Sequence, residues 1–319
     1  MTEAVWVALA VLAVPIVLVL ATAGCGTVLA PAADDVATPA PETPPQGTGP
    51  GSATKKPDPR IEASAGLAIE VELKRSYAST VLDTVGLVGY WRLGEAQAEL
   101  LKPQPLAQNL SNTPNLNGRY MSPGAVELEV KGALAKGDDG AARFDGGYVE
   151  VPFQPVLQLD EVALELWLKI DAPDTPLRTV VGYFETPPFN DTLLTRGFRL
   201  RARTVLESGA SVLLVQGMFG GMSTALEVKH PTAAGWHYVV LTYNMTLGQE
   251  KAELYVDDQM AIANGKCTLK LAGQQPLRFA VTTGLNLTTF NGSLDEVALY
   301  GQYMPKATVD DHRAIALSA

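Results

Sequence analysis

An acidic pair, Asp295-Glu296, opens an apolar segment that ends at Tyr300. Apolar and small side chains alternate along the segment, which predicts a strand with two distinct faces. Asn291-Gly292 comes just before it and predicts a tight turn that feeds the strand, because both residues adopt positive φ angles easily. A carboxylate in an apolar strand needs a hydrogen-bond donor, an opposite charge or a metal ion to offset its lost hydration. We therefore expect this pair to have a specific partner.

Glu161 and Glu165 form a second pair of carboxylates whose spacing suggests chemistry. Side chains four positions apart on a strand share a face. Two carboxylates that face one cleft are the catalytic groups of glycosidases. Trp167 shares the same face, however, and a large aromatic side chain there is typical of a packed core. The pattern favours packing over catalysis, and we expect a protein that is not an enzyme.

The histidines and cysteines form no recognisable catalytic set. The three histidines are His230, His237 and His312, and none lies within five residues of another. Their spacing therefore identifies neither a metal-histidine site nor a Ser-His-Asp triad. The two cysteines, Cys25 and Cys267, exclude a disulfide framework as the source of stability, although one bridge between them stays open.

The first 24 residues predict a segment directed to a membrane. Residues 4–23 carry no charge and are long enough to cross a bilayer. Small residues directly precede Cys25, which resembles the site where bacterial lipoproteins are cleaved and lipidated on the cysteine. Thr22 replaces the usual Leu, and Glu3 stands where a basic residue is usual, so an uncleaved anchor helix is the alternative. Both alternatives place the rest of the chain outside the cytoplasm, tethered to a membrane.

Residues 25–60 are predicted to be a disordered linker, because they are rich in Pro, Ala, Gly and Thr and nearly free of large apolar side chains. The whole chain has a formal net charge of -10 at pH 7. Nucleic-acid binding draws on clustered Lys and Arg, and the sequence shows no such cluster. We therefore expect no nucleic-acid partner.

Residues 61–319 predict one all-β domain with a helix near each end. The spacing of Tyr77, Val81 and Val85 predicts the first helix, and Pro305 starts the second, which runs to Leu317. Between them, short apolar runs alternate with Gly, Pro and Asn turns, a pattern typical of a two-sheet antiparallel sandwich. The predicted strands are residues 88–93, 141–152, 162–170, 179–184, 197–203, 211–217, 224–228, 236–243, 252–256, 259–263, 277–282 and 294–300.

Six segments of this region match, in order, the motifs of one family. They are Val88–Glu95 (VGYWRLGE), Ala141–Pro152 (AARFDGGYVEVP), Leu164–Lys169 (LELWLK), Gly235–Tyr243 (GWHYVVLTY), Ala252–Asp258 (AELYVDD) and Asn291–Tyr300 (NGSLDEVALY). Together they resemble the laminin-G-like, or concanavalin A-like, jelly-roll domains of secreted bacterial proteins. The resemblance implies a two-sheet antiparallel jelly roll. It says little about the ligand, because this fold serves many functions.

The resemblance also implies a structural Ca²⁺ ion. In this family such an ion commonly joins an acidic residue after the first strand to the aspartate of the last motif, which here are Glu95 and Asp295. Two carboxylates with turn carbonyls are enough for a calcium site to be proposed. Asn109 stands where the family has a further aspartate. The alternative is that Glu95 and Asp295 accept backbone hydrogen bonds without a metal.

Sugar binding would need exposed aromatic rings, and most aromatic residues here fall in strand motifs. The best loop candidate is Met218-Phe219-Gly220-Gly221-Met222, which predicts an adaptable apolar patch at a Gly-rich turn. Further candidate rings are Tyr183, Phe184, Phe189 and Phe198. For each of these rings, ordinary packing is the favoured explanation.

We expect a surface-tethered, non-catalytic module that recognises an extracellular carbohydrate. A structural or protein-adhesion module is the first alternative, and a divergent glycoside hydrolase is the second. The three differ in what they need: an aromatic-lined concave face, a flat apolar patch, or two carboxylates about 5 to 10 Å apart in a cleft. The sequence identifies neither the sugar nor a partner protein.

Overall fold

The computed structural model describes residues 75–134, 140–185, 194–246, 248–270, 274–282 and 288–318. The predicted signal peptide or anchor (1–24), the linker (25–60) with Cys25, and Phe189 lie outside these ranges. Within these ranges, no helix combines the length and apolar character needed to cross a membrane.

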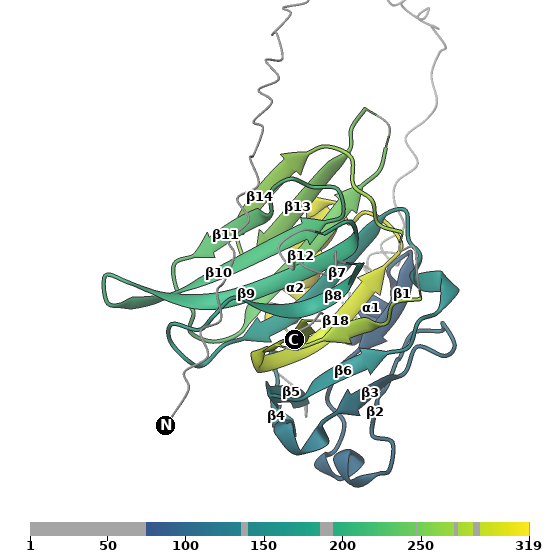
Figure 1. Ribbon diagram of the computed structural model, residues 1–319, viewed down its shortest axis with the longest axis vertical. Helices are drawn as coiled ribbons and strands as arrows, with labels where there is room; N and C mark the ends of the chain where they lie inside the picture. The colour runs from purple at the N-terminus through teal and green to yellow at the C-terminus, as the bar shows by residue number, and fades with distance from the viewer. Residues whose placement is uncertain are drawn as a thin grey trace, which may run out of the picture. The chain divides into compact units, whose positions relative to one another are not determined.

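The described residues form two large antiparallel sheets, which confirms the predicted all-β sandwich (Figure 1). In sheet A the strand order is β14 (Gln259–Asn264), β13 (Lys251–Val256), β12 (His237–Asn244), β7 (Val162–Lys169), β18 (Asn291–Tyr300), β5 (Gly140–Asp145) and β4 (Val126–Lys131), and β1 (Leu87–Trp91) also pairs with β18. In sheet B the order is β11 (Leu226–His230), β10 (Ala210–Phe219), β9 (Arg196–Glu207), β8 (Arg178–Glu185), β15 (Leu277–Phe279), β6 (Tyr148–Val151), β3 (Gly118–Met121) and β2 (Leu106–Ala107). A small sheet pairs β16 (Val281–Thr282) with β17 (Thr288–Thr289), and short 3₁₀ helices lie at Gln97–Leu101, Pro123–Ala125 and Pro155–Leu157.

The main hydrophobic core lies between the two sheets. Every second residue of a strand points inward, so β7 contributes Leu164, Leu166 and Leu168 to this core. Sheet B contributes residues such as Phe198 and Leu200 in the same way. This continuous apolar interior is the main source of stability, because the hydrophobic effect scales with the apolar area removed from water.

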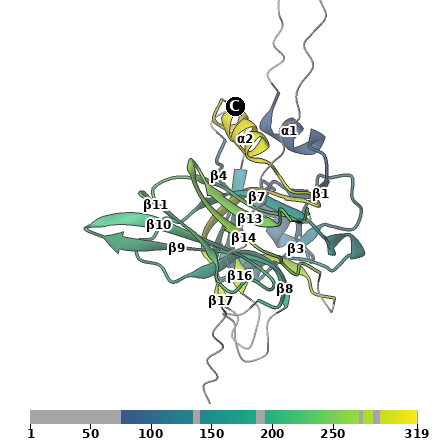
Figure 2. The same ribbon diagram turned by 90° about the horizontal axis from the view of Figure 1, so that it is seen from above.

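Both predicted helices are present, and both cover the outer face of sheet A (Figure 2). Helix α1 (Tyr77–Asp83) is capped by Ser76, whose hydroxyl accepts a hydrogen bond from the Ser79 backbone N–H at 3.1 Å. Helix α2 (Lys306–Ser318) buries Val309, His312 and Ala316. The outer face of sheet A is therefore a second packed layer.

The structure corrects two local predictions. Asn291 and Gly292 do not form a turn, because both already pair with β5 as the first residues of β18. A Cβ on Gly292 would lie 2.5 Å from the Lys169 carbonyl oxygen, so glycine allows close strand approach here. The predicted strand 141–152 is two strands in different sheets, since Gly146 (φ +107°) bends the chain between β5 and β6.

Candidate functional site

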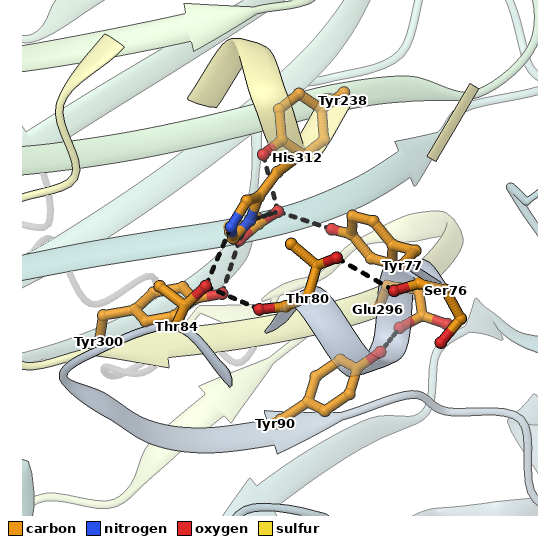
Figure 3. Close-up of polar contacts among 10 residues, drawn as sticks. Ser76, Tyr77, Thr80, Thr84, Tyr90, Tyr238, Glu296, Tyr300 and His312 are labelled. Atoms are coloured by element: carbon orange, nitrogen blue, oxygen red, sulfur yellow. Dashed lines mark hydrogen bonds and ion pairs between the residues drawn. The ribbon is translucent and has the colours of Figure 1, made fainter. Parts of the chain in front are cut away.

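Glu165 lies at the centre of a buried polar cluster on the outer face of sheet A (Figure 3). Its side chain is 0% exposed. The hydroxyls of Tyr77, Tyr238 and Tyr300 each donate a hydrogen bond to it at 2.7 Å. His312 Nδ1 lies 3.0 Å from both carboxylate oxygens. Residues from α1, α2 and three strands of sheet A thus meet at one carboxylate, and we call these five residues the Glu165 cluster.

Glu165 and His312 form a buried ion pair. Burial alone raises the pKa of Glu165. The hydrogen bond and positive charge of His312 and the hydrogen bonds of the tyrosines outweigh burial, so the pKa lies below its usual value. Burial alone lowers the pKa of His312, but the carboxylate of Glu165 outweighs it and raises the pKa. His312 Nε2 contacts the Thr84 hydroxyl at 3.0 Å (Figure 3). The pair therefore ties both helices to the sheet.

The Glu165 cluster does not have the geometry of a glycosidase site. All its oxygen contacts are to protein groups, and it has no solvent-exposed surface for a substrate. Glu161 precedes β7, and its oxygens accept hydrogen bonds from the backbone N–H groups of Met245 and Tyr303. Trp167 packs on the same face as Glu165, as predicted. Glu161 and Glu165 therefore do not form a catalytic pair in a cleft.

The Asp295-Glu296 pair has specific partners, as expected for carboxylates that are 0% exposed. Asp295 Oδ2 accepts a hydrogen bond from the Ala133 N–H at 2.8 Å. Glu296 Oε1 accepts a hydrogen bond from Arg92 Nε–H at 2.8 Å, and Oε2 forms a hydrogen bond with the Tyr90 hydroxyl (Figure 3). Burial raises the pKa of Glu296 to about 8. These protein contacts offset the free-energy cost of burying the two carboxylates.

The predicted calcium ligands, Glu95 and Asp295, accept hydrogen bonds from different parts of the chain. Glu95 accepts hydrogen bonds from the Gln108 N–H and the Tyr120 hydroxyl, both at 2.7 Å. Asn109, in the place of the family's aspartate, accepts hydrogen bonds from backbone N–H groups and holds its own loop together. A calcium ion between Glu95 and Asp295 stays a prediction.

Three of the predicted ligand-binding side chains are buried, so they form no exposed apolar patch, whereas Phe189 lies outside the described residues. Phe219 is 0% exposed, and Tyr183 and Met218 are also buried. The reason is that β10 runs as far as Phe219, which pairs with Phe198 of β9 and packs against Tyr243. Met222 is partly buried against the main core. A buried ring offers no face to a sugar.

Partly exposed aromatic rings are few within the described residues. They are Tyr148, Phe153, Trp236 and Tyr303, and all other described Phe, Tyr and Trp side chains are buried. These four come from separate segments of the chain. The described residues therefore offer few partly exposed rings for the aromatic-lined face that the carbohydrate prediction required.

The structure instead contains a pocket at one end of the sandwich, which we call the end pocket. Its volume is about 370 Å³. Sheet A contributes residues from the end of β7 and the start of β18, sheet B contributes residues of β8 and β9, and β17 closes one wall. The lining residues are Ile170, Ala172, Thr175, Pro176, Arg178, Ala202, Thr288, Thr289, Phe290 and Asn291.

Backbone contacts hold the walls of the end pocket in place. Ala280, at φ +64°, ends β15, and its N–H donates to the Val180 carbonyl at 2.7 Å. Its own carbonyl accepts a hydrogen bond from the Phe290 N–H at 2.9 Å, which positions β17 beside sheet B. On the other wall, the Thr175 and Thr204 hydroxyls lie 3.0 Å apart, and each also accepts from a backbone N–H. The pocket is thus built on fixed elements.

Residues 143–310, just over half of the chain, match the Laminin_G_3 family model, described as the concanavalin A-like lectin/glucanases superfamily. The chain belongs to this family. The predicted laminin-G-like jelly roll is therefore confirmed by both the family match and the two antiparallel sheets. A search of curated protein sequences found no match.

Several solved structures are similar to this laminin-G-like chain at low sequence identity. Domain 4 of AbnA, a GH43 extracellular arabinanase from Geobacillus stearothermophilus in complex with arabinotriose, is 14% identical with a TM-score of 0.44, over 71% of this chain and 97% of that one. A Trypanosoma rangeli sialidase in complex with sialic acid is 15% identical (TM-score 0.49; 74% and 33% covered). The binding domain of Paraclostridial Mosquitocidal Protein 1 is 14% identical (TM-score 0.47; 71% and 51% covered). These similarities concern the fold alone.

The end pocket of this laminin-G-like domain combines an apolar floor with polar walls. Ile170, Ala202 and Phe290 are buried beneath it. The polar groups are hydroxyls of three threonines, one amide at Asn291 and one guanidinium at Arg178. Its lining residues include no carboxylate, histidine or cysteine. No sequence pattern predicts this set, because its members come from separate segments that only the fold brings together.

Proposed function

We propose that this chain is a non-catalytic carbohydrate-binding protein whose end pocket receives one or two sugar rings. The observation that carries the proposal is the lining of the pocket: hydroxyl, amide and guanidinium groups over an apolar floor, with no carboxylate. A volume of about 370 Å³ falls in the range of small-molecule sites. Membership of a superfamily of lectins and glucanases agrees with a carbohydrate ligand.

Each part of the pocket suits one part of a sugar. Thr288, Thr289 and Asn291 offer hydrogen-bond donors and acceptors to sugar hydroxyls. The floor around Phe290 and Ile170 suits the C–H groups of a pyranose ring. Arg178 presents a planar, permanently charged fork, which pairs with carboxylates in a bidentate manner. We therefore propose that acidic sugars bind better than neutral ones.

The absence of carboxylates from the pocket lining supports binding without hydrolysis. Most glycoside hydrolases need two carboxylates that flank the scissile bond. Asp145, outside the lining, accepts a hydrogen bond at 3.0 Å from the side-chain amide of Asn291.

We also propose that the protein acts outside the cytoplasm, held to a membrane by a lipid on Cys25 or by an uncleaved anchor helix. The support for this is the apolar segment 4–23 followed by small residues and Cys25. A tethered binding domain on a linker of residues 25–60 would reach an extracellular glycan or a surface protein.

The test is a glycan array probed with the full-length chain in detergent micelles, with added calcium and with a chelator. We expect selective binding to glycans that carry a carboxylate. Arg178→Ala should weaken binding by about 10- to 100-fold, the effect of losing a charge-assisted hydrogen bond. Arg119→Ala is the matched control, because Arg119 is an exposed arginine that is not part of the pocket lining.

A blank array would contradict the proposal and favour the protein-adhesion alternative. Equal losses for Arg178→Ala and Arg119→Ala would show that general charge, and not the end pocket, accounts for binding. Release of reducing sugar from a bound oligosaccharide would contradict the non-catalytic part of the proposal.

A further inference from the structure

Two histidines and an aspartate converge where three consecutive strands begin or end. His230 is the last residue of β11, His237 the first of β12, and Asp257 directly follows β13. One donor atom from each of the three lies within 4.8 Å of the other two. His237 Nδ1 is 2.7 Å from Asp257 Oδ2, and His230 Nε2 is 3.5 Å from the same oxygen. The two imidazole rings contact each other edge to face, with centroids 4.8 Å apart.

The hydrogen bonds of this group leave lone pairs directed inward. His230 Nδ1 lies 2.9 Å from the Thr232 carbonyl oxygen, which can only accept, so this nitrogen carries the proton. In a neutral ring, Nε2 of His230 then presents a lone pair to the Asp257 carboxylate, which is also an acceptor. A proton on Nε2 or a metal ion between the two atoms would remove this repulsion. Metal-bound histidines commonly show this arrangement, with the second nitrogen held by a backbone carbonyl.

His237 supplies a second observation. Its side chain is almost completely buried, and its Nε2 has no hydrogen-bond partner. A buried imidazole nitrogen without a partner is unfavourable unless it serves another purpose. Because Nδ1 of His237 faces Asp257, Nδ1 is the nitrogen that can bind an ion together with that carboxylate, and Nε2 then carries the proton.

We propose that His230, His237 and Asp257 bind a divalent transition-metal ion such as Zn²⁺, with Asp258 as the fourth ligand. In a tetrahedral zinc site, metal–ligand bonds of about 2.0–2.1 Å place the donor atoms roughly 3.3 Å apart. The separation of 3.5 Å between His230 and Asp257 already meets this requirement. The His237–Asp257 hydrogen bond of 2.7 Å must open slightly. Asp258 Oδ1 lies 3.9 Å from His230 Nε2, and its exposed side chain is free to rotate inward.

The ligand set selects the class of ion. Imidazole nitrogen with carboxylate oxygen suits Zn²⁺, Co²⁺ and Ni²⁺, whereas Ca²⁺ and Mg²⁺ prefer oxygen alone. The neighbouring positive charge, Arg313 of α2, approaches the other oxygen of Asp257, Oδ1, at 3.8 Å. The Tyr238 N–H donates to that oxygen too, at 3.1 Å. Oδ2 is therefore the oxygen directed toward the histidines.

A metal at this position would join the two sheets. β11 is the end strand of sheet B, whereas β12 and β13 belong to sheet A. An ion bound to His230 and to His237 with Asp257 would connect them directly at one edge of the sandwich. An ion that binds only the folded state stabilises it, and the effect grows with its concentration.

The experiment is a Zn²⁺ titration of the full-length chain after removal of metals with a chelator, followed by isothermal titration calorimetry and thermal unfolding. We expect about one ion per chain, a higher Tm with Zn²⁺, and no comparable site for Ca²⁺. Co²⁺ should give the absorption bands of four-coordinate cobalt. His230→Gln should lower Zn²⁺ affinity by at least about 100-fold, the upper end of the loss seen for outer-shell partners.

The double variant His230→Gln/His237→Gln is the matched control, because it keeps Cys25 and Cys267. Zinc binding that persists in this variant would belong to the thiols and would overturn the proposal. So would a wild-type Tm that does not respond to Zn²⁺. His230 lies at the end of its strand and is partly exposed, so His230→Gln alone tests the site even if the double variant unfolds. Asp258→Asn should give a smaller loss than either histidine substitution.

Discussion

The Glu165 cluster and the end pocket use similar hydroxyl groups in opposite ways. In the cluster, three tyrosine hydroxyls and His312 all point to one carboxylate that has no exposed surface. In the end pocket, threonine hydroxyls, Asn291 and Arg178 line an open volume of about 370 Å³. The hydrogen-bonding groups of the cluster bond to one another, whereas those of the end pocket can form hydrogen bonds with a ligand.

This difference separates stability from binding within one sandwich. A buried polar group that loses its partner costs the full free energy of desolvation, so changes in the cluster should destabilise the fold. A group at a solvent-filled pocket can exchange its partner for water. Changes there should affect ligand affinity and leave the free energy of unfolding nearly unchanged.

The largest expected effect is that of Glu165→Ala. It leaves protonated His312 and three tyrosine hydroxyls buried without their acceptor, and should lower the free energy of unfolding by about 3–5 kcal/mol. Urea denaturation monitored by circular dichroism measures this. Glu161→Gln, at a partly exposed carboxylate four positions earlier, is the control and should cost about 1 kcal/mol or less. Equal losses at the two positions would remove the distinction between cluster and surface.

The next effect is a dependence of stability on pH. The raised pKa of His312 contributes stability that is complete below its ordinary value of 6.5 and is lost as the pH rises through the raised value. The lowered pKa of Glu165 contributes stability that is complete above 4.5 and is lost as the pH falls through the lowered value. The pair should therefore stabilise the fold most between pH 4.5 and 6.5.

Glu296 should add to the decline on the alkaline side. Its pKa is raised to about 8, so the folded protein keeps a proton that the unfolded chain releases above pH 4.5, and stability falls as the pH rises toward 8. Glu296→Gln should make this decline shallower, while the part due to His312 remains. Tm measured at several pH values tests both, and parallel curves for the wild type and the variant would contradict the role of Glu296.

The smallest expected effect on stability is that of Thr288→Val in the end pocket. This change removes a hydroxyl at nearly constant volume, and should alter the free energy of unfolding by no more than about 0.5 kcal/mol. The affinity of the Thr288→Val variant for the glycan selected on the array should still fall several-fold. A loss of stability as large as that of the Glu165 variant would mean that the pocket wall is part of the core.

Most of the fold could be predicted because strand signals are local. The apolar runs and turn residues located most strands to within a few residues, and the family motifs gave the order. The predicted strand 277–282 is two strands divided at Ala280, and other errors arose at glycines. Gly292 and Gly220-Gly221 suggest turns or exposed loops. Gly292, however, lies within β18, and the buried strand β10 continues to Phe219, directly before Gly220-Gly221. A glycine that permits close packing looks the same in sequence as one that permits a turn.

The candidate sites could not be predicted because they depend on distant pairs. Tyr77 and His312 lie 88 and 147 residues from Glu165, and no spacing rule connects them. His230, His237 and Asp257 looked unrelated because seven and 20 residues separate them, yet consecutive strands bring them to one edge. Phe219 and Tyr183 have residue types suited to a ligand, but only the strand register shows that they point into the core.

The meeting of α1 and α2 above sheet A has a consequence for the order in which the chain folds. Thr84 of the first helix end and His312 of the second are 228 residues apart, yet they touch. Contacts over such separations slow folding, because the intervening chain must be ordered first. During synthesis, β7 emerges long before both its neighbour β18 and helix α2. Glu165 therefore gains Tyr300 and His312 only after the end of the described chain has been made.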